Sequence, residues 1–359
     1  MFNAQRLSLA RRRRRLSGKG LAELVGVSPV TISRLEKGNN EPDPDTVAAI
    51  SESLGFPVEF FFGGDVDMLS QEAASFRSLT AMTAKERDAA LSAGTLAFML
   101  SDWVDARFNL PPIDLLDLGH ESDPGGAAVT LRQHWGLGEQ PIRNMLKLLE
   151  AKGVRVFSLA ENTANVDAFS VWRDEVPYVF LNTMKSSEHS RFDAAHELGH
   201  LVLHRHGAPN GRAAENEANQ FASSFLMPSA DVLGRVRRIS SIDQLIDTKR
   251  RWGVSVAALA YRLHKLQVLS DWQYRTFCIQ INKLGYRKSE PKGLAREGSV
   301  VWKKVLSALW AEKVTRTHIA QDLSVPVEEI EGLLFGITHG DDDPVSTGPH
   351  ERIPLQVIS

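Results

Sequence analysis

The sequence predicts a mainly α-helical protein with a small β-sheet, an α+β fold whose first region is all α. Apolar residues recur three and four positions apart in several segments, which is the spacing of one helix face. Serines and glycines suited to helix ends divide the first 40 residues into short helices. Residues 178–182 are apolar and β-prone, which indicates a strand.

The composition is that of a globular protein with two or three domains. The chain has 359 residues, of which 43% are apolar and 24% charged. No run approaches the roughly 18 apolar residues that a membrane-spanning helix needs, and the first residues lack the apolar segment of a secretory signal. The single cysteine, Cys278, cannot form an internal disulfide. We therefore expect a cytoplasmic protein without a membrane partner.

The charge is divided unevenly along the chain. Residues 1–40 contain nine lysines and arginines against two acids, a net charge of +7, so the remaining 319 residues carry about −9 of the total of −2. A basic head on an acidic body indicates an anionic partner for the head alone, and double-stranded DNA is the leading candidate. The alternative is a solvated arginine run on one exposed helix.

Residues 17–38 have the pattern of two short helices joined by a tight turn. Ser17 is suited to begin the first helix, Gly26 to end it, and Ser28 to begin the second, which starts at Pro29. This is the unit that places its second helix in the major groove of DNA. Arg34 is predicted to pair with guanine, and Lys19, Lys37 and residues 11–15 with phosphates. The predicted DNA-binding residues are Arg11, Arg12, Arg13, Lys19, Ser28, Val30, Thr31, Ser33, Arg34 and Lys37.

The head resembles a Cro/C1-type (XRE-family) helix-turn-helix domain over about residues 3–64. The resemblance rests on Leu21-Ala22, Gly26-Val27-Ser28, Ile32-Ser33 and Glu36-Lys37-Gly38. It implies an all-α DNA-binding domain that reads paired half-sites, and hence a homodimer. The sequence departs from the family at Gly18 and Gly20, where polar residues are usual, which puts a DNA contact in doubt. A helix-turn-helix can also be a protein-binding module.

A metal-site signature occurs at residues 196–200, which read His-Glu-Leu-Gly-His. On a helix, His196 and His200 share a face and can reach one Zn²⁺, and Glu197 can take a proton from water beside it. A third ligand is expected on the helix of residues 215–228. Glu215 is turned more towards the apolar face of that helix than Glu217. His204 is a further alternative, either as a ligand or as a residue that contacts a ligand.

Residues 125–270 resemble the ImmA/IrrE family of zinc-dependent metalloendopeptidases. The segments that carry the resemblance include "DAFSVWRDEVPYVFLNTMKSSEHSRFDAAHELGHLVLH" and "ENEANQFASSFLMP". The resemblance implies a zincin-like domain in which His196, His200 and Glu215 hold Zn²⁺ and Glu197 is the catalytic base. It also implies that helix-turn-helix repressors are the protein substrates, cleaved to relieve repression of stress-response or mobile-element genes.

Two further features of this domain are expected to serve peptide cleavage. The developing oxyanion needs a donor besides the metal, and Tyr178, His204 and His206 are candidates by residue type. The strand of residues 178–182 is expected to lie beside the active-site helix, where it receives an extended substrate by edge pairing, forms a buried core strand, or does both.

The other segments are predicted to be helical or linking. Residues 65–124 are expected to form a helical connector, in which Thr83 is suited to begin a helix from Ala84 to Arg107. The likeliest hinge is at 114–127. Residues 271–338 are expected to form a C-terminal helical domain. Within it, residues 318–326 repeat the pattern of the head, as a degenerate helix-turn-helix or, in the favoured interpretation, as a packing or dimerising bundle. We expect the tail, residues 339–359, to be disordered.

The leading hypothesis is a DNA-binding regulator fused to a zinc endopeptidase that cleaves a repressor or itself. One alternative is a transcriptional regulator whose zinc site is a sensor without turnover, and another is an antitoxin-like regulator. The presence of Glu197 favours an enzyme, because metal binding alone does not need that base.

Overall fold

The computed structural model describes residues 1–71, 82–159, 168–206, 211–338 and 356–357. The described fold is mainly helical with a small mixed sheet, as the sequence predicts. Within the described residues, no helix has both the length and the apolar character needed to cross a membrane.

The N-terminal head is a cluster of short helices. They are α1 (Ala4–Arg13), α2 (Gly18–Val25), α3 (Pro29–Glu36), α4 (Pro44–Leu54) and the 3-10 helix η1 (Val58–Phe62). The predicted caps are confirmed: Ser17 Oγ accepts a hydrogen bond from Gly20 N at 3.0 Å, and Ser28 Oγ accepts one from Thr31 N at 3.1 Å. Gly26 adopts the left-handed conformation, with φ 78°, that ends α2.

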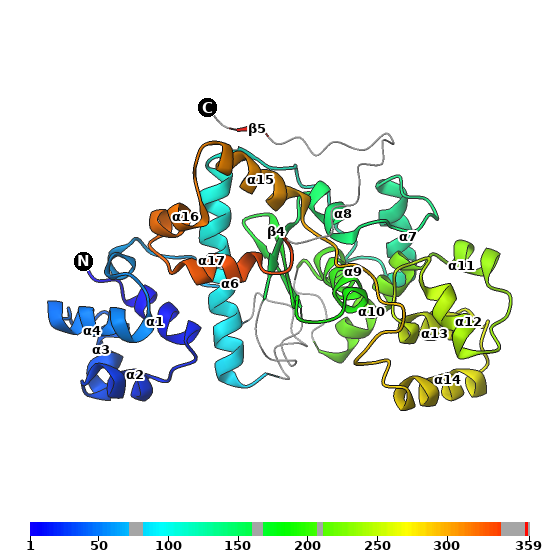
Figure 1. The fold of residues 1–359 in the computed structure, drawn as a ribbon, viewed down its shortest axis with the longest axis horizontal. Coiled ribbons are helices and arrows are strands. Elements are labelled where there is room, and N and C mark those ends of the chain that lie inside the picture. Colours follow the sequence, from blue (N-terminus) through cyan, green and yellow to red (C-terminus); the bar gives the residue numbers. More distant parts are fainter. Residues whose placement is uncertain (72–81, 160–167, 207–210, 339–355, 358–359) are drawn as a thin grey trace.

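Helix α6 (Ala84–Asp105) lies between the head and the rest of the molecule (Figure 1). It begins at the predicted residue, Thr83, with a capping box to Glu86. One side packs against α1 and another approaches the sheet. At Gly94 the helix comes so close to Leu69 that a Cβ would lie 2.5 Å from Leu69 Cδ2. The predicted connector is therefore a central element of the core.

The sheet has three described strands, β2 (Arg155–Ser158), β3 (Phe169–Arg173) and β4 (Val176–Leu181), in the order β2-β4-β3. Strand β4 pairs in parallel with β2 and antiparallel with β3. The expectation that this β4 segment receives substrate by edge pairing is therefore wrong, because both of its edges are already used. Strand β3 is the edge strand beside the helix that carries the His-Glu-x-x-His motif.

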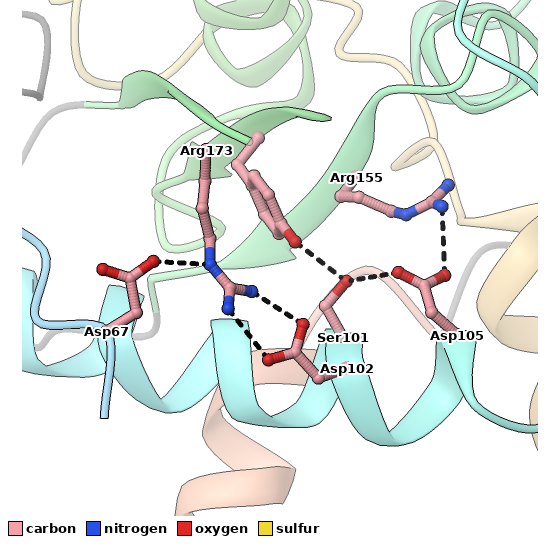
Figure 2. A network of polar contacts seen from close by, with 7 residues as sticks. Asp67, Ser101, Asp102, Asp105, Arg155 and Arg173 are labelled. Carbon is pink, nitrogen blue, oxygen red and sulfur yellow. Dashed lines mark hydrogen bonds and ion pairs between the residues drawn. The ribbon is translucent and has the colours of Figure 1, made fainter. Parts of the chain in front are cut away.

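A polar network fastens α6 to the sheet (Figure 2). Arg173 of β3 pairs with Asp67 at 2.7 Å and with both carboxylate oxygens of Asp102, at 2.7 and 3.0 Å. On the same helix, Asp105 pairs with Arg155 of β2 at 3.0 Å. Since Asp67 lies between the head and α6, the network joins three parts of the chain at β3.

Most of the remaining elements surround the sheet or extend away from the head, whereas one helix near the C-terminus lies beside α6 on the side of the head (Figure 1). They are β1 (Phe108–Asn109), α7 (Pro124–His134), α8 (Met145–Ala151), α9 (Ser187–Leu203), α10 (Arg212–Leu226), α11 (Ser229–Arg235), α12 (Ile242–Lys249), α13 (Val256–Lys265), α14 (Asp271–Lys283), α15 (Val300–Ala311), α16 (Arg316–Leu323), α17 (Val327–Leu334) and β5 (Gln356–Val357). Strand β5 pairs antiparallel with β1. The rest of the tail predicted to be disordered, 339–355 and 358–359, lies outside the described residues.

The segment predicted as a hinge, residues 114–127, is instead bound to the body. Asp114 N donates to Lys152 O at 3.1 Å, and Leu118 N donates to Val202 O at 2.7 Å. The indole of Trp135 donates to Asp114 O at 2.9 Å. These contacts come from residues distant in sequence, so the Asp- and Gly-rich composition of the segment did not reveal them.

Candidate metal centre and nucleic-acid interface

Two packed helices, α9 and α10, carry the three predicted metal ligands. His196 and His200 lie one turn apart on α9, and Glu215 lies in the first turn of α10. The helices approach closely at Gly199, where a Cβ would lie 3.2 Å from Ala218 Cα. The glycine in the motif thus lets α10 come near enough for Glu215 to reach both imidazoles.

The three ligand side chains form a compact group, called the triangle below, in which one ligand atom of each residue lies within 4.8 Å of the other two. His196 Nε2 and His200 Nε2 are 3.1 Å apart, and each faces a different Glu215 oxygen: Oε2 lies 3.3 Å from His196 Nε2, and Oε1 lies 3.4 Å from His200 Nε2. Ligands at 2.0–2.1 Å from a tetrahedral Zn²⁺ are separated by about 3.3 Å. The side chains are 14%, 8% and 7% exposed, so the triangle lies in a largely dry environment.

Neighbouring polar groups fix which nitrogen of each imidazole carries its proton. Asn219 Oδ1 lies 3.1 Å from His196 Nδ1, and an amide oxygen can only accept. Glu217 lies 2.9 Å from His204 Nε2, and His204 Nδ1 lies 2.9 Å from His200 Nδ1. A proton on His204 Nε2 leaves its Nδ1 free to accept from His200. In their neutral form both ligand histidines then direct an unprotonated Nε2 into the triangle.

The contacts of Glu215, Glu217 and His204 distinguish these three candidates for the third ligand. Glu215 closes the triangle, and it forms with His196 and His200 the group of described residues able to hold a metal ion. His204 and Glu217 lie behind His200 as a hydrogen-bonded chain. The sequence indicated Glu217 as an alternative ligand and His204 as a ligand or a residue that contacts one, but it did not indicate that the two contact each other, because that contact depends on the packing of α10 on α9.

The charges within the triangle favour an anionic carboxylate. Burial alone would raise the pKa of Glu215, but the hydrogen bonds that His196 and His200 donate when Nε2 carries a proton outweigh it and hold that pKa well below its usual range. Burial would lower the pKa of His196, but its hydrogen bond to Glu215 and the charge of Glu197 raise it instead. The carboxylate therefore needs a positive partner, which a proton on histidine or a metal ion can provide.

The other predicted interface is the exposed side of α3. Ile32 and Leu35 are buried, while Val30, Ser33 and Arg34 are exposed, as predicted for a recognition helix. Thr31 is partly exposed, and Ser28 and Lys37 at the two ends of α3 are exposed. Arg12 and Lys19 are also exposed, so these basic side chains remain candidates for phosphate contacts.

The expectation that Arg11 and Arg13 offer free guanidinium groups to phosphates is not met in this conformation. Arg11 is 13% exposed and pairs with Glu36 at 2.6 Å, which ties α1 to α3. Arg13 pairs with Glu329 of α17 at 2.6 Å. Both partners lie far along the chain from these arginines, which is why the basic run alone suggested free charges.

Two family models match the chain. The model described as "Helix-turn-helix" matches residues 7–61, and the model described as "IrrE N-terminal-like domain" matches residues 149–264. An XRE-type helix-turn-helix domain thus precedes an IrrE/ImmA-like domain. Both lie within the predicted ranges, and a search of curated proteins gave no match to the chain.

The IrrE/ImmA-like domain also places the predicted base, Glu197, beside the metal ligands. Glu197 follows His196 on α9, is 3% exposed, and accepts a hydrogen bond from Ser170 Oγ at 2.7 Å. Ser170 lies on the edge strand β3, so one strand both borders the site and orients the carboxylate. Sequence reasoning missed Ser170, whose one signal is a hydroxyl between the apolar residues Phe169 and Val171.

Each predicted oxyanion donor is engaged with another polar group. Tyr178 is 1% exposed, packs among aromatic rings, and donates to Ser101 at 3.1 Å, so its candidacy is wrong. His204 is engaged with His200 and Glu217. His206 is 74% exposed and lies 2.9 Å from Asp117.

Two neutral imidazoles and one carboxylate on converging helices are the donor set of many catalytic zinc sites. Their spacing and tautomers fit such an ion. His196, His200 and Glu215 would hold it, with Asn219 and His204 orienting the two histidines.

Proposed function

We propose that the protein is a DNA-binding transcriptional regulator whose IrrE/ImmA-like domain is a zinc-dependent endopeptidase. The observation that carries the proposal is the triangle of His196, His200 and Glu215 with Glu197 beside it. A sensor needs the first three residues, whereas peptide hydrolysis also needs a base. The helix-turn-helix family match and the exposed face of α3 support the DNA-binding part.

The chain's own residues supply proton transfer and orientation in this proposal. A bound zinc ion would polarise a scissile carbonyl and lower the pKa of water. Glu197 takes a proton from the attacking water and returns it to the leaving amine. Ser170 holds the Glu197 carboxylate in place. An extended peptide adds to the edge strand β3, since β4 is already paired on both sides.

The proposed substrate is an XRE-type repressor, or the chain's own helix-turn-helix domain. The resemblance to the ImmA/IrrE family supports the first, and the presence of such a domain in the same chain supports the second. Cleavage, in the cytoplasm, would change the expression of stress-response or mobile-element genes. A homodimer would read paired half-sites.

The first experiment is zinc per chain by elemental analysis, on wild type and His200→Ala purified without chelator. We expect about one zinc in the wild type and far less in the variant, because a catalytic centre of this type uses three protein ligands. A folded wild type without zinc would refute the proposed metal centre and favour a regulator without peptidase activity.

Glu197→Gln separates an enzyme from a sensor. We expect this variant to keep its zinc and its DNA binding but to lose cleavage by at least about 100-fold, the low end for loss of a general base. Self-cleavage and cleavage of XRE-type repressors would be followed by mass spectrometry. Glu121→Gln, an exposed acid outside the site, is the control. Equal cleavage by Glu197→Gln and wild type would exclude Glu197 as the base.

A further inference from the structure

The C-terminal helices α16 and α17 have the geometry of the helix-turn-helix in the head. Helix α2 ends at Gly26, with φ 78°, and α16 ends at Ser324, with φ 54°, so both turns contain a left-handed residue. A valine follows in each turn, and an eight-residue helix comes next. Each second helix is followed by a left-handed glycine, Gly38 at φ 68° and Gly336 at φ 69°.

The two units also agree residue by residue. When the two sequences are aligned without a gap, buried residues of the head fall at the same positions as buried residues of the C-terminal unit. The pairs are Leu21 with Ile319, Ala22 with Ala320, Ile32 with Ile330, and Leu35 with Leu333. Residues 316–336 therefore share both the fold of the head unit and the positions of its core.

The surface of the second unit that corresponds to the recognition surface of the head is acidic rather than basic. The positions of Val30, Thr31 and Ser33 on α3 are taken by Glu328, Glu329 and Glu331 on α17, and the position of Arg34 is taken by Gly332. Three glutamates on the face that would enter the groove repel phosphates. This unit is thus unsuited to DNA and suited to a cationic protein surface.

A cationic surface lies directly against α17 in the structure. Glu329, 4% exposed, binds Arg13 at 2.6 Å through one carboxylate oxygen and Arg14 through the other. The side chain of Arg13, the last residue of α1, is 18% exposed. That of Arg14, the residue after it, is 32% exposed. Figure 1 shows α16 beside α6 on the side that faces the head, and α17 crossing α6 toward the sheet, where it also contacts β2.

We propose that residues 316–336 are a second helix-turn-helix unit whose acidic recognition surface binds α1 of the head and withholds Arg13 and Arg14 from DNA. The proposal rests on DNA binding by the head, as proposed above. Glu329 competes with backbone phosphates for the two arginines, so part of the head's positive charge becomes available only when α17 is displaced. The contact lowers affinity for DNA of any sequence, because phosphate contacts do not depend on sequence.

The test compares full-length Glu329→Gln and Glu331→Gln in binding a short random-sequence DNA duplex, by fluorescence anisotropy at several salt concentrations. Glu331 is exposed on the same helix, so its substitution removes an equal charge without freeing Arg13 or Arg14. We expect Glu329→Gln to bind at least about threefold more tightly and its salt slope to steepen by about 1 to 2, the change for one or two further phosphate contacts. Glu331→Gln should keep the wild-type slope.

Substitution of the arginines checks the same mechanism if Glu329→Gln folds poorly, as judged by thermal melting. Arg13→Gln/Arg14→Gln should bind DNA nearly as wild type does, and should cancel the gain of Glu329→Gln in the triple variant. Equal slopes for Glu329→Gln and Glu331→Gln, or a large loss of affinity in the double arginine variant, would overturn the proposal. If wild type and every variant fail to bind DNA, the proposed DNA-binding function is refuted as well.

Discussion

His200 can present an unprotonated Nε2 to a metal only while its Nδ1 proton has an acceptor, and His204 is that acceptor. Glu217 in turn holds the His204 proton on Nε2, at 2.9 Å. Loss of such an outer partner typically costs 10- to 100-fold in metal affinity. We therefore expect Glu217→Ala to weaken zinc binding by about 10-fold, measured by competition with a chromophoric chelator.

The control for this substitution is Gln220→Ala, at an exposed position on the same helix. Both variants remove a polar side chain from α10, but Gln220 is not part of the chain to His200. Glu217→Gln keeps an acceptor oxygen and should recover part of the affinity. If Glu217→Ala and Gln220→Ala bind zinc equally well, the chain does not position His200.

Glu150 is a buried carboxylate whose protonation affects stability near neutral pH. Burial raises its pKa to about 7 from an ordinary value of 4.5, although Ser299 and the backbone N–H groups of Val300 and Val301 donate to it. Between these two values the folded protein holds a proton that the unfolded chain releases. Stability therefore falls as pH rises through this window, by at most about 1.4 kcal/mol per pH unit.

Comparison with Glu150→Gln isolates this effect. The neutral side chain cannot ionise, so the melting temperature of wild type minus that of the variant should decrease from pH 5 to pH 8. Other titrating groups contribute equally to both proteins and cancel in the difference. A difference that stays constant over this range, or that grows with pH, would show that Glu150 does not titrate in this way.

At the scale of elements, the metal centre depends on the close approach of α9 and α10. A Cβ at Gly199 would lie 3.1 Å from Phe221 Cδ1 and 3.2 Å from Ala218 Cα. Gly199→Val should separate the helices, lower stability by about 1–3 kcal/mol, and weaken zinc binding because Glu215 moves with α10. Thermal melting and zinc content would be measured against Gly234→Val, since a Cβ at Gly234 meets nothing within 4 Å. Equal effects of both substitutions would contradict this account.

Elements defined by local signals were predictable, and contacts between distant elements were not. Ser17, Ser28 and Thr83 begin helices where the sequence indicates, because a cap involves residues only a few positions apart. Glu215 was found from its position on one helix face. Ser170 lies 27 residues from Glu197, and Glu329 lies 316 residues from Arg13. Local sequence contains no information on such pairs.

At the scale of the whole molecule, the basic head is joined to an acidic body rather than separated from it. Helix α1 packs on α6, and Arg13 and Arg14 bind Glu329 of α17. The buried residues of head and body belong to one continuous apolar cluster. The separate domains suggested by the charge division are therefore in contact, and neither the linker composition nor the charge count indicated where.

This arrangement predicts which basic side chains contact DNA phosphates. Arg12 and Lys37 are exposed on the head, whereas Arg237 is exposed in the connection between α11 and α12, at the opposite end of the molecule (Figure 1). If DNA binds the head, Arg12→Gln and Lys37→Gln should each reduce the salt slope of duplex binding by about 0.9, whereas Arg237→Gln should not change it. Fluorescence anisotropy over a salt series measures the slope. A slope that falls with Arg237→Gln but not with the two head substitutions would place the DNA on the body instead.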